Sequence, residues 1–254
     1  MRHSLTILLL LVGVSGVAAG GPLHRSIELS DGSEMELRVF SAKGEVLMLG
    51  FPCDQGTGIA ETRGAEAMAA HGIEVWMADL LGAHFLPVAP SSMRDLEGGG
   101  VRDLIALAHR ETGKQIVLVS SGYGSLPTLR GAKLWLDAPE GENRLGGALL
   151  FYPMLADAPP EPGKPVTYPA IVHQTATPVY IFQPELSPTR FWLKRLVKTL
   201  AEGGATVKSE FLPGIRPNFY QRPDATEAEL AATQQLPEMM LRGFAHLTET
   251  RAKE

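Results

Sequence analysis

Cysteine is almost absent from this 254-residue chain, which contains only Cys53. A lone cysteine excludes an intrachain disulfide, so a chain of this length must be stabilised by its hydrophobic core. The composition favours a small buried side chain at Cys53 over the alternatives, a nucleophilic thiol or a disulfide between chains. The sequence also lacks the H-E-x-x-H spacing of a metal site and the longer glycine pattern of a dinucleotide site. We therefore predict neither a metal nor another cofactor.

Positive charge is scarce as well. The chain has 23 lysines and arginines against 28 acidic residues, which gives a net charge of -5 and an isoelectric point near 5.8. Without a basic run, nothing in the sequence provides the electrostatic footprint that nucleic acids require. Hydrophobic residues make up 44% of the chain and charged residues 20%, which is typical of a globular protein. The partner we expect is therefore a small-molecule ligand or another protein, and no nucleic acid.

Long apolar runs are missing outside the N-terminus. Arg2 and His3 precede the apolar run from Leu5 to Val14, and small residues dominate up to Gly21. This order is typical of a secretory signal peptide, with a cleavage pattern at Val17-Ala18-Ala19. The run is shorter than the about 20 residues that a membrane span requires, although an uncleaved anchor is the alternative.

The N-terminal pattern predicts one boundary in the chain, between a signal peptide and the mature protein. We predict that residues 1–19 are a signal peptide and that residues 20–254 form one domain. The mature protein is then exported, either periplasmic or secreted, with no stable membrane span after signal cleavage. No internal linker or repeat in the sequence indicates a second domain.

Apolar periodicity predicts an alternation of strands and helices. A hairpin is indicated by the alternating segments 26–29 and 35–40 around Asp31-Gly32, because glycine readily adopts the positive φ of a tight turn. Further strands are predicted at 45–49, 73–78, 116–119, 145–152, 177–183 and 205–212, and helices at 59–70, 96–110, 126–136, 189–201 and 226–248, the last with a break at Pro237. This order predicts a single-domain α/β fold, with a mostly parallel sheet, helices on both faces and an N-terminal hairpin.

The stretch from Gly113 to Leu126 organises the rest of the chain. Its four apolar residues Ile116–Val119 indicate a strand that is buried on both faces. The small residues Ser120, Gly122 and Gly124 follow, where a strand must reverse sharply into a helix. This layout resembles the nucleophile elbow of the α/β-hydrolase superfamily.

Other segments resemble the same family in the same order. The stretch Leu49-Gly50-Phe51-Pro52 is similar to the loop whose backbone N–H groups help to form the oxyanion hole. The segment 72–82 resembles the next strand of the family with its Asp-x-x-Gly turn. Residues 177–183 resemble the strand before the triad acid, and residues 211–214 the segment before the triad histidine. The resemblance covers nearly all of the expected mature chain and implies an α/β-hydrolase-like fold.

The catalytic positions that the resemblance implies depart from the family. The nucleophile position is Gly122, which has no side chain. The acid position lies near Glu185, where the family has aspartate. After Gly214 no histidine occurs until His246, so the sequence lacks a base at the position where the family has its own. Acyl transfer by this fold needs all three groups, so we predict a degenerate member without hydrolase activity.

A displaced nucleophile is the alternative hypothesis. Ser121 is the candidate nucleophile if the turn is shifted by one residue, with His84 as the candidate base on a loop that follows a strand. The steric argument opposes this, because Val119 and Tyr123 would then occupy positions that need almost no side chain. The other interpretation is that Ser120 and Ser121 hydrogen-bond their own turn and that His84 is a solvated loop residue.

A binding role places the ligand at the carboxyl ends of the strands, where open α/β sheets bind ligands. The candidate binding residues are Gly50, Phe51, Gly122 and Tyr123. Rings in this region, including those of Tyr152 and Phe85, either line a cleft for a small apolar or acyl ligand or simply fill it.

Overall fold

A computed structural model describes residues 21–51, 59–139, 145–158, 160–161 and 163–251 of the chain. The expected signal peptide, Cys53 and Asp54 lie outside the described residues. Within the described part, no helix is long and apolar enough to cross a membrane.

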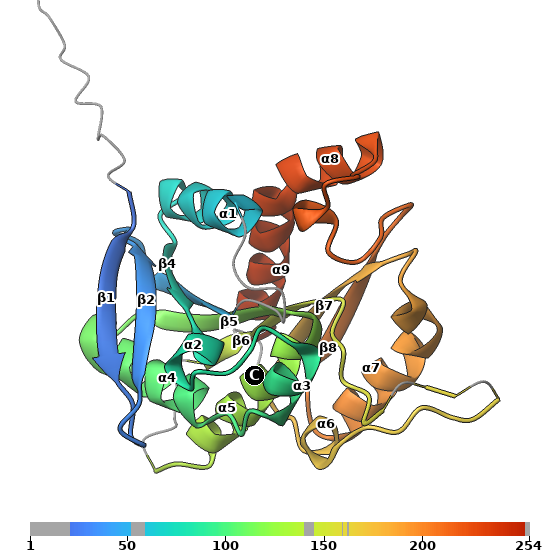
Figure 1. The fold of residues 1–254 in the computed structure, drawn as a ribbon, viewed down its shortest axis with the longest axis horizontal. Coiled ribbons are helices and arrows are strands. Elements are labelled where there is room, and N and C mark those ends of the chain that lie inside the picture. Colours follow the sequence, from blue (N-terminus) through green and yellow to red (C-terminus); the bar gives the residue numbers. More distant parts are fainter. Residues whose placement is uncertain (1–20, 52–58, 140–144, 159, 162, 252–254) are drawn as a thin grey trace, which may run out of the picture.

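One eight-stranded sheet runs through the molecule in the order β1-β2-β4-β3-β5-β6-β7-β8 (Figure 1). β1 pairs antiparallel with β2, and β2 pairs antiparallel with β4, while every later pair is parallel. The strands are β1 (Leu23–Glu28), β2 (Glu34–Phe40), β3 (Val46–Phe51), β4 (Glu74–Ala78), β5 (Gln115–Ser121), β6 (Leu145–Phe151), β7 (Val179–Pro184) and β8 (Val207–Leu212). The predicted hairpin is confirmed, with Gly32 at a φ of 83° in its turn. The predicted α/β class is confirmed too.

Helices cover both faces of the sheet (Figure 1). Apolar residues of α4, α5, α6 and α7 pack in one core cluster, and those of α1 and α9 pack in the other. The helices are α1 (Ile59–Ala70), α2 (Leu80–Ala83), α3 (Pro90–Asp95), α4 (Gly99–Thr112), α5 (Ser125–Leu136), α6 (Ala170–His173), α7 (Leu193–Glu202), α8 (Glu227–Gln234) and α9 (Leu236–Arg251), with short 3-10 turns η1 (Gly122–Gly124), η2 (Pro188–Trp192) and η3 (Phe219–Gln221).

The central strand β5 contributes side chains to both cores. Ile116 and Leu118 belong to the cluster under α4 and α5, whereas Val117 and Val119 pack on the side of α1 and α9. This alternation follows from the period of two in a strand. It explains why the apolar run is continuous, because a strand between two helical layers has no solvent-facing side.

Two segments differ from the sequence prediction. The helix predicted at 96–110 begins only at Gly99, after a separate short helix α3 that starts with Pro90. The prediction missed α3 because its proline occupies the first helical turn, where the missing N–H costs nothing. The break in the last helix is confirmed, and it lies at Gln235, just before Pro237.

Candidate functional site

The strand–turn–helix elbow is present between β5 and α5. Ser121 ends β5 in an extended conformation, and Gly122 follows with a φ of 53°. This left-handed backbone region is costly for residues that carry a Cβ atom and is readily adopted by glycine. The elbow geometry is therefore retained at position 122, while the side chain that would carry a nucleophile is absent.

The two serines before Gly122 are both buried. Ser120 Oγ donates to Ser125 Oγ on α5 at 3.5 Å, which matches the expected hydrogen bonding within the turn. Ser120 and Ser121 both line a cavity of about 70 Å³ together with Gly50 and Phe51. This cavity also contacts α1 and α9, so Ser121 lies at the layer of helices opposite to α5.

His84 lies in another part of the molecule. It follows α2, and its Nδ1 atom is 3.8 Å from Asp31 Oδ2 in the turn of the hairpin. It lines a separate pocket with Gly98 and Gly99 at the start of α4. Among the described residues, no hydrogen bond joins His84 or another histidine to Ser121. The structure thus brings Ser121 close to Gly50 and Phe51, but not to His84.

The positions of the triad acid and base hold other contacts. Glu185 follows β7, and its carboxylate accepts a hydrogen bond from the backbone N–H of Gly214 at 2.9 Å. His246, the single histidine after Gly214, lies on α9 and contacts the ring of Tyr180 edge-on at 5.5 Å. Neither side chain is therefore placed beside the elbow by these contacts.

A tyrosine–asparagine cluster occupies the region after β6 and β8. The Tyr152 hydroxyl donates to Asn218 Oδ1 at 2.7 Å and lies 2.6 Å from the Tyr220 hydroxyl. Because Tyr152 has one hydroxyl proton, the second contact requires Tyr220 to be the donor. Tyr152 and Asn218 both have positive φ angles, 41° and 56°. Sequence reasoning missed this cluster, since no local pattern indicates a positive φ at tyrosine.

The larger pocket lies beside Tyr123, the residue that follows Gly122. Its volume is about 380 Å³. The described residues that line it are Arg94, Tyr123, Pro153, Met154, Leu155, Ala156, Ala158, Pro160, Val166, Tyr168, Gln183, Ser187, Pro188, Thr189, Trp192, Leu196 and Pro217. Of the predicted binding residues, Gly50 and Phe51 line the smaller cavity, and Gly122 lines neither of the two. Tyr123 is the predicted ring that lines the larger pocket.

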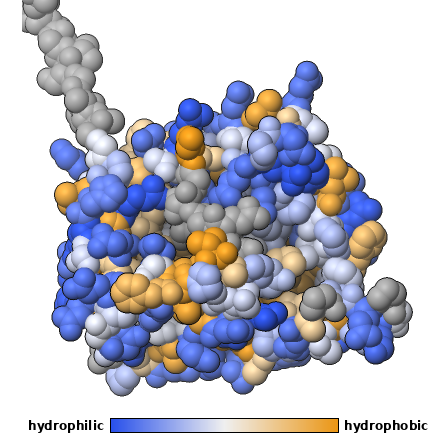
Figure 2. Space-filling view, in the orientation of Figure 1, coloured by the Kyte–Doolittle hydropathy of each residue, from blue (hydrophilic) through white to orange (hydrophobic). Residues whose placement is uncertain are grey.

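Phe85 is a correction to the expected cleft. Its side chain is 97% exposed, its backbone has a φ of 53°, and it lines none of the three main pockets of the described part. Figure 2 shows apolar residues gathered near the centre of the face that carries α2 and α3. Phe85 and the 61% exposed Val88 belong to the loop between these helices. The sequence predicted that the Phe85 ring lines or fills the cleft, but the loop turns the ring outwards.

Comparison with known proteins identifies the fold. No family model and no curated protein matches the sequence. Among solved structures, a protein assigned as a dienelactone hydrolase from Klebsiella pneumoniae has a TM-score of 0.63 at 15% identity, over 89% of this chain and 99% of that one. Esterase Est22 has a TM-score of 0.64 at 13% identity, over 89% and 79% of the two chains. Esterase 2 from Thermogutta terrifontis has a TM-score of 0.57 at 19% identity, over 89% and 96%.

The fold and the elbow together define the class of this protein. The likeness to the structures above extends over 89% of this chain, which includes the sheet and the turn at Gly122. This chain has the α/β-hydrolase fold, as the sequence resemblance implied. Within the described residues, no group of three or more histidine, cysteine or acidic side chains is arranged to hold a metal ion.

Proposed function

We propose that this protein is an exported α/β-hydrolase-like protein that does not hydrolyse esters and binds a small ligand in the pocket beside Tyr123. The observation that carries the proposal is Gly122, which has the backbone conformation of the elbow and no side chain. Acyl transfer needs a hydroxyl or thiol at this point, because the attacking atom must face the oxyanion donors.

The contacts of the other two triad positions support the same conclusion. A base must lie within about 3.2 Å of the proton it removes, or reach it through one water molecule. After β8, where the family has the histidine base, this chain has Asn218 and Tyr220, and both side chains form hydrogen bonds with Tyr152. Glu185 holds the backbone of Gly214. With these two positions engaged in structural contacts and no side chain at Gly122, the described residues provide no proton relay at the elbow.

The pocket beside Tyr123 supports the binding part of the proposal. Its volume of about 380 Å³ falls in the range of small-molecule sites, which are concave and mostly apolar with a few polar groups. Tyr168 and Trp192 face it from the loop after β6 and from η2. A protein partner that inserts a side chain here is the second kind of occupant that the sequence left open.

Covalent labelling tests the loss of catalysis. We expect purified protein to gain no mass after incubation with paraoxon or a fluorophosphonate, because such reagents need an activated nucleophile. Esterase 2 from Thermogutta terrifontis, which is known in a form phosphorylated by paraoxon, is the positive control. Intact mass spectrometry measures the adduct, and circular dichroism shows that the sample is folded.

Two serine variants make the labelling test decisive. Both serines line the smaller cavity; Ser121→Ala removes the candidate nucleophile, and Ser120→Ala removes the neighbouring hydroxyl that contacts Ser125. An adduct on the wild-type protein that persists in Ser120→Ala and disappears in Ser121→Ala would establish the displaced-nucleophile esterase instead.

Export is the part of the proposal that rests on the N-terminal sequence. Arg2, the apolar run from Leu5 to Val14 and the small residues after it have the order of a cleavable signal. We expect protein recovered from the periplasm or medium of an expressing bacterium to begin near Gly20, as measured by N-terminal sequencing. Recovery of the uncleaved chain in the membrane fraction would favour the anchor.

A further inference from the structure

The pocket beside Tyr123 has an uneven distribution of charge. Arg94 is the one charged residue among the described residues that line it. An apolar pocket with a single cationic group attracts anions, and among the described residues no carboxylate lines the wall to oppose them.

The Arg94 guanidinium is available for a ligand. Its Nε atom is 3.3 Å from Asp95 Oδ1, and the Asp95 side chain is 72% exposed. Such exposed ion pairs contribute little and exchange readily with solvent. Among the described residues, none forms a hydrogen bond with the two terminal nitrogens of Arg94. These two N–H groups present the fork that matches a carboxylate.

The backbone that carries Arg94 is fixed to the elbow helix. Arg130 on α5 donates from Nη1 to the carbonyl oxygens of Arg94 and Leu96, each at 2.6 Å. α5 begins directly after η1, so one rigid helix positions both Tyr123 and the segment of Arg94. Fixing the segment before binding reduces the entropy that a ligand would otherwise lose.

The end of β7 provides a neutral polar group in the same pocket. The buried Gln183 donates from Nε2 to the carbonyl of Pro184 and to Thr189 Oγ1, both at 3.0 Å. Ser187 and Thr189 hydroxyls lie 2.8 Å apart. The amide protons of Gln183 are therefore satisfied within the protein, and this wall adds no charge that would repel an anion.

We propose that this pocket binds an aromatic or alicyclic monocarboxylate, with its apolar body against Tyr123, Tyr168 and Trp192 and its carboxylate on Arg94. The inference rests on the proposed function, because it names the ligand class of the same pocket. The rings supply apolar contact area. Arg94 supplies the preference for a negative charge.

A matched pair of probes tests the charge preference. Calorimetry with 2-naphthoate and with 2-naphthamide compares two ligands of nearly equal shape that differ in charge. We expect Arg94→Gln to weaken binding of the carboxylate about 10- to 100-fold, the usual loss for a charge-assisted hydrogen bond. The amide should bind the two proteins equally. Arg130 bonds the backbone carbonyl of residue 94 and not its side chain, so the variant keeps its anchor.

Lys194→Gln is the control for net charge. Lys194 is exposed on α7 and does not line the pocket, and its replacement changes the net charge by the same amount. We expect this variant to bind 2-naphthoate like the wild type. An equal loss in both variants would overturn the direct contact with Arg94 and indicate a long-range electrostatic effect.

The neutral dye Nile red separates failure of the ligand class from failure of the proposed function. Suppose that the wild type binds Nile red or 2-naphthamide. If it then binds 2-naphthoate more weakly than 2-naphthamide, or if Arg94→Gln binds 2-naphthoate as tightly as the wild type does, the carboxylate proposal is overturned and binding in the pocket stands. If neither naphthalene probe nor Nile red binds, both proposals are overturned. Intrinsic tryptophan fluorescence shows where the probe binds. If binding changes this fluorescence in the wild type but not in Trp192→Phe, the bound probe lies in this pocket.

Discussion

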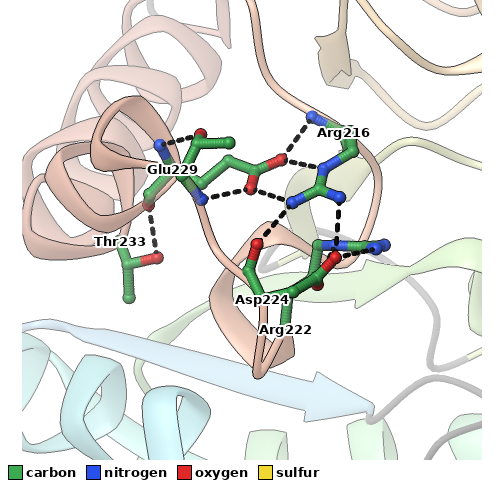
Figure 3. A network of polar contacts seen from close by, with 6 residues as sticks. Arg216, Arg222, Asp224, Glu229 and Thr233 are labelled. Atoms are coloured by element: carbon green, nitrogen blue, oxygen red, sulfur yellow. Dashed lines mark hydrogen bonds and ion pairs between the residues drawn. The ribbon is translucent and has the colours of Figure 1, made fainter.

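Glu229→Gln is expected to lower the free energy of unfolding at neutral pH by about 2 kcal/mol, the range for hydrogen bonds to charged groups. The Glu229 side chain is fully buried, and its carboxylate accepts bonds from Arg216 Nε at 2.7 Å and Nη2 at 2.6 Å (Figure 3). It also accepts from the backbone N–H groups of Arg216 and Thr226. Removing the charge weakens all of these bonds together.

The same carboxylate predicts an acid-sensitive step. The hydrogen bonds from Arg216 lower the pKa of Glu229 from 4.5 to about 2, although burial acts in the opposite direction. Because the folded-state pKa lies below the unfolded-state value, the stabilisation is complete above about pH 5 and is lost as the pH falls towards 2. Urea denaturation at a series of pH values measures this slope, which should be smaller in Glu229→Gln.

Glu227 provides the matched control on the same helix. It is an exposed acid in the first turn of α8, and Glu227→Gln should leave both stability and its pH dependence nearly unchanged. If the Glu227 and Glu229 variants behave alike, the network of Figure 3 does not stabilise the fold. The network matters for the tyrosine–asparagine cluster, because Arg216 lies just before Asn218 and Tyr220 in the chain.

Gly131→Ala is expected to destabilise the fold by about 2 kcal/mol, within the usual cost of overpacking a core. A Cβ atom at Gly131 would lie 2.4 Å from Val101 Cβ and 2.8 Å from the carbonyl oxygen of Gly98. Gly98 itself has a φ of 89° at the start of α4. Since the nearest groups include backbone, α4 and α5 would have to move apart, and the elbow at the start of α5 would move with them.

Gly99→Ala is the control for the glycine substitution. It replaces a glycine in the first turn of α4, where the new Cβ would meet nothing within 4 Å beyond its own stretch of helix. Alanine loses less backbone entropy on folding, so stability should stay equal or rise slightly. Thermal melts of the two variants compare the positions directly. Equal melting temperatures would show that close approach of α4 and α5 does not limit the packing.

Local pattern accounts for much of the fold and for little of the site. The hairpin at Gly32, the buried run in β5 and the break before Pro237 were predictable because periodicity and turn chemistry act over a few residues. The pairing of Arg216 with Glu229 was not predicted, since it joins a loop to a helix across 13 residues without a periodic signal.

The absence of a side chain at position 122 was determined by the sequence alone. A glycine at position 122 has no reactive atom in any fold, and no histidine lies between Gly214 and His246. These statements concern covalent structure, so tertiary contacts cannot change them. The order of strands and helices follows in the same way from the order of apolar segments along the chain.

Only the tertiary structure decided which side chains meet. Ser121 lines the cavity of Gly50 and Phe51, while His84 lies against Asp31, although Ser121 ends the strand β5 and His84 lies on the loop after β4. Arg94 joins Trp192 in one pocket from positions almost 100 residues apart in sequence. Such contacts depend on the order of the strands, the packing of the helices and the course of the loops. These are stabilised by interactions between residues far apart in sequence, which no local pattern reveals.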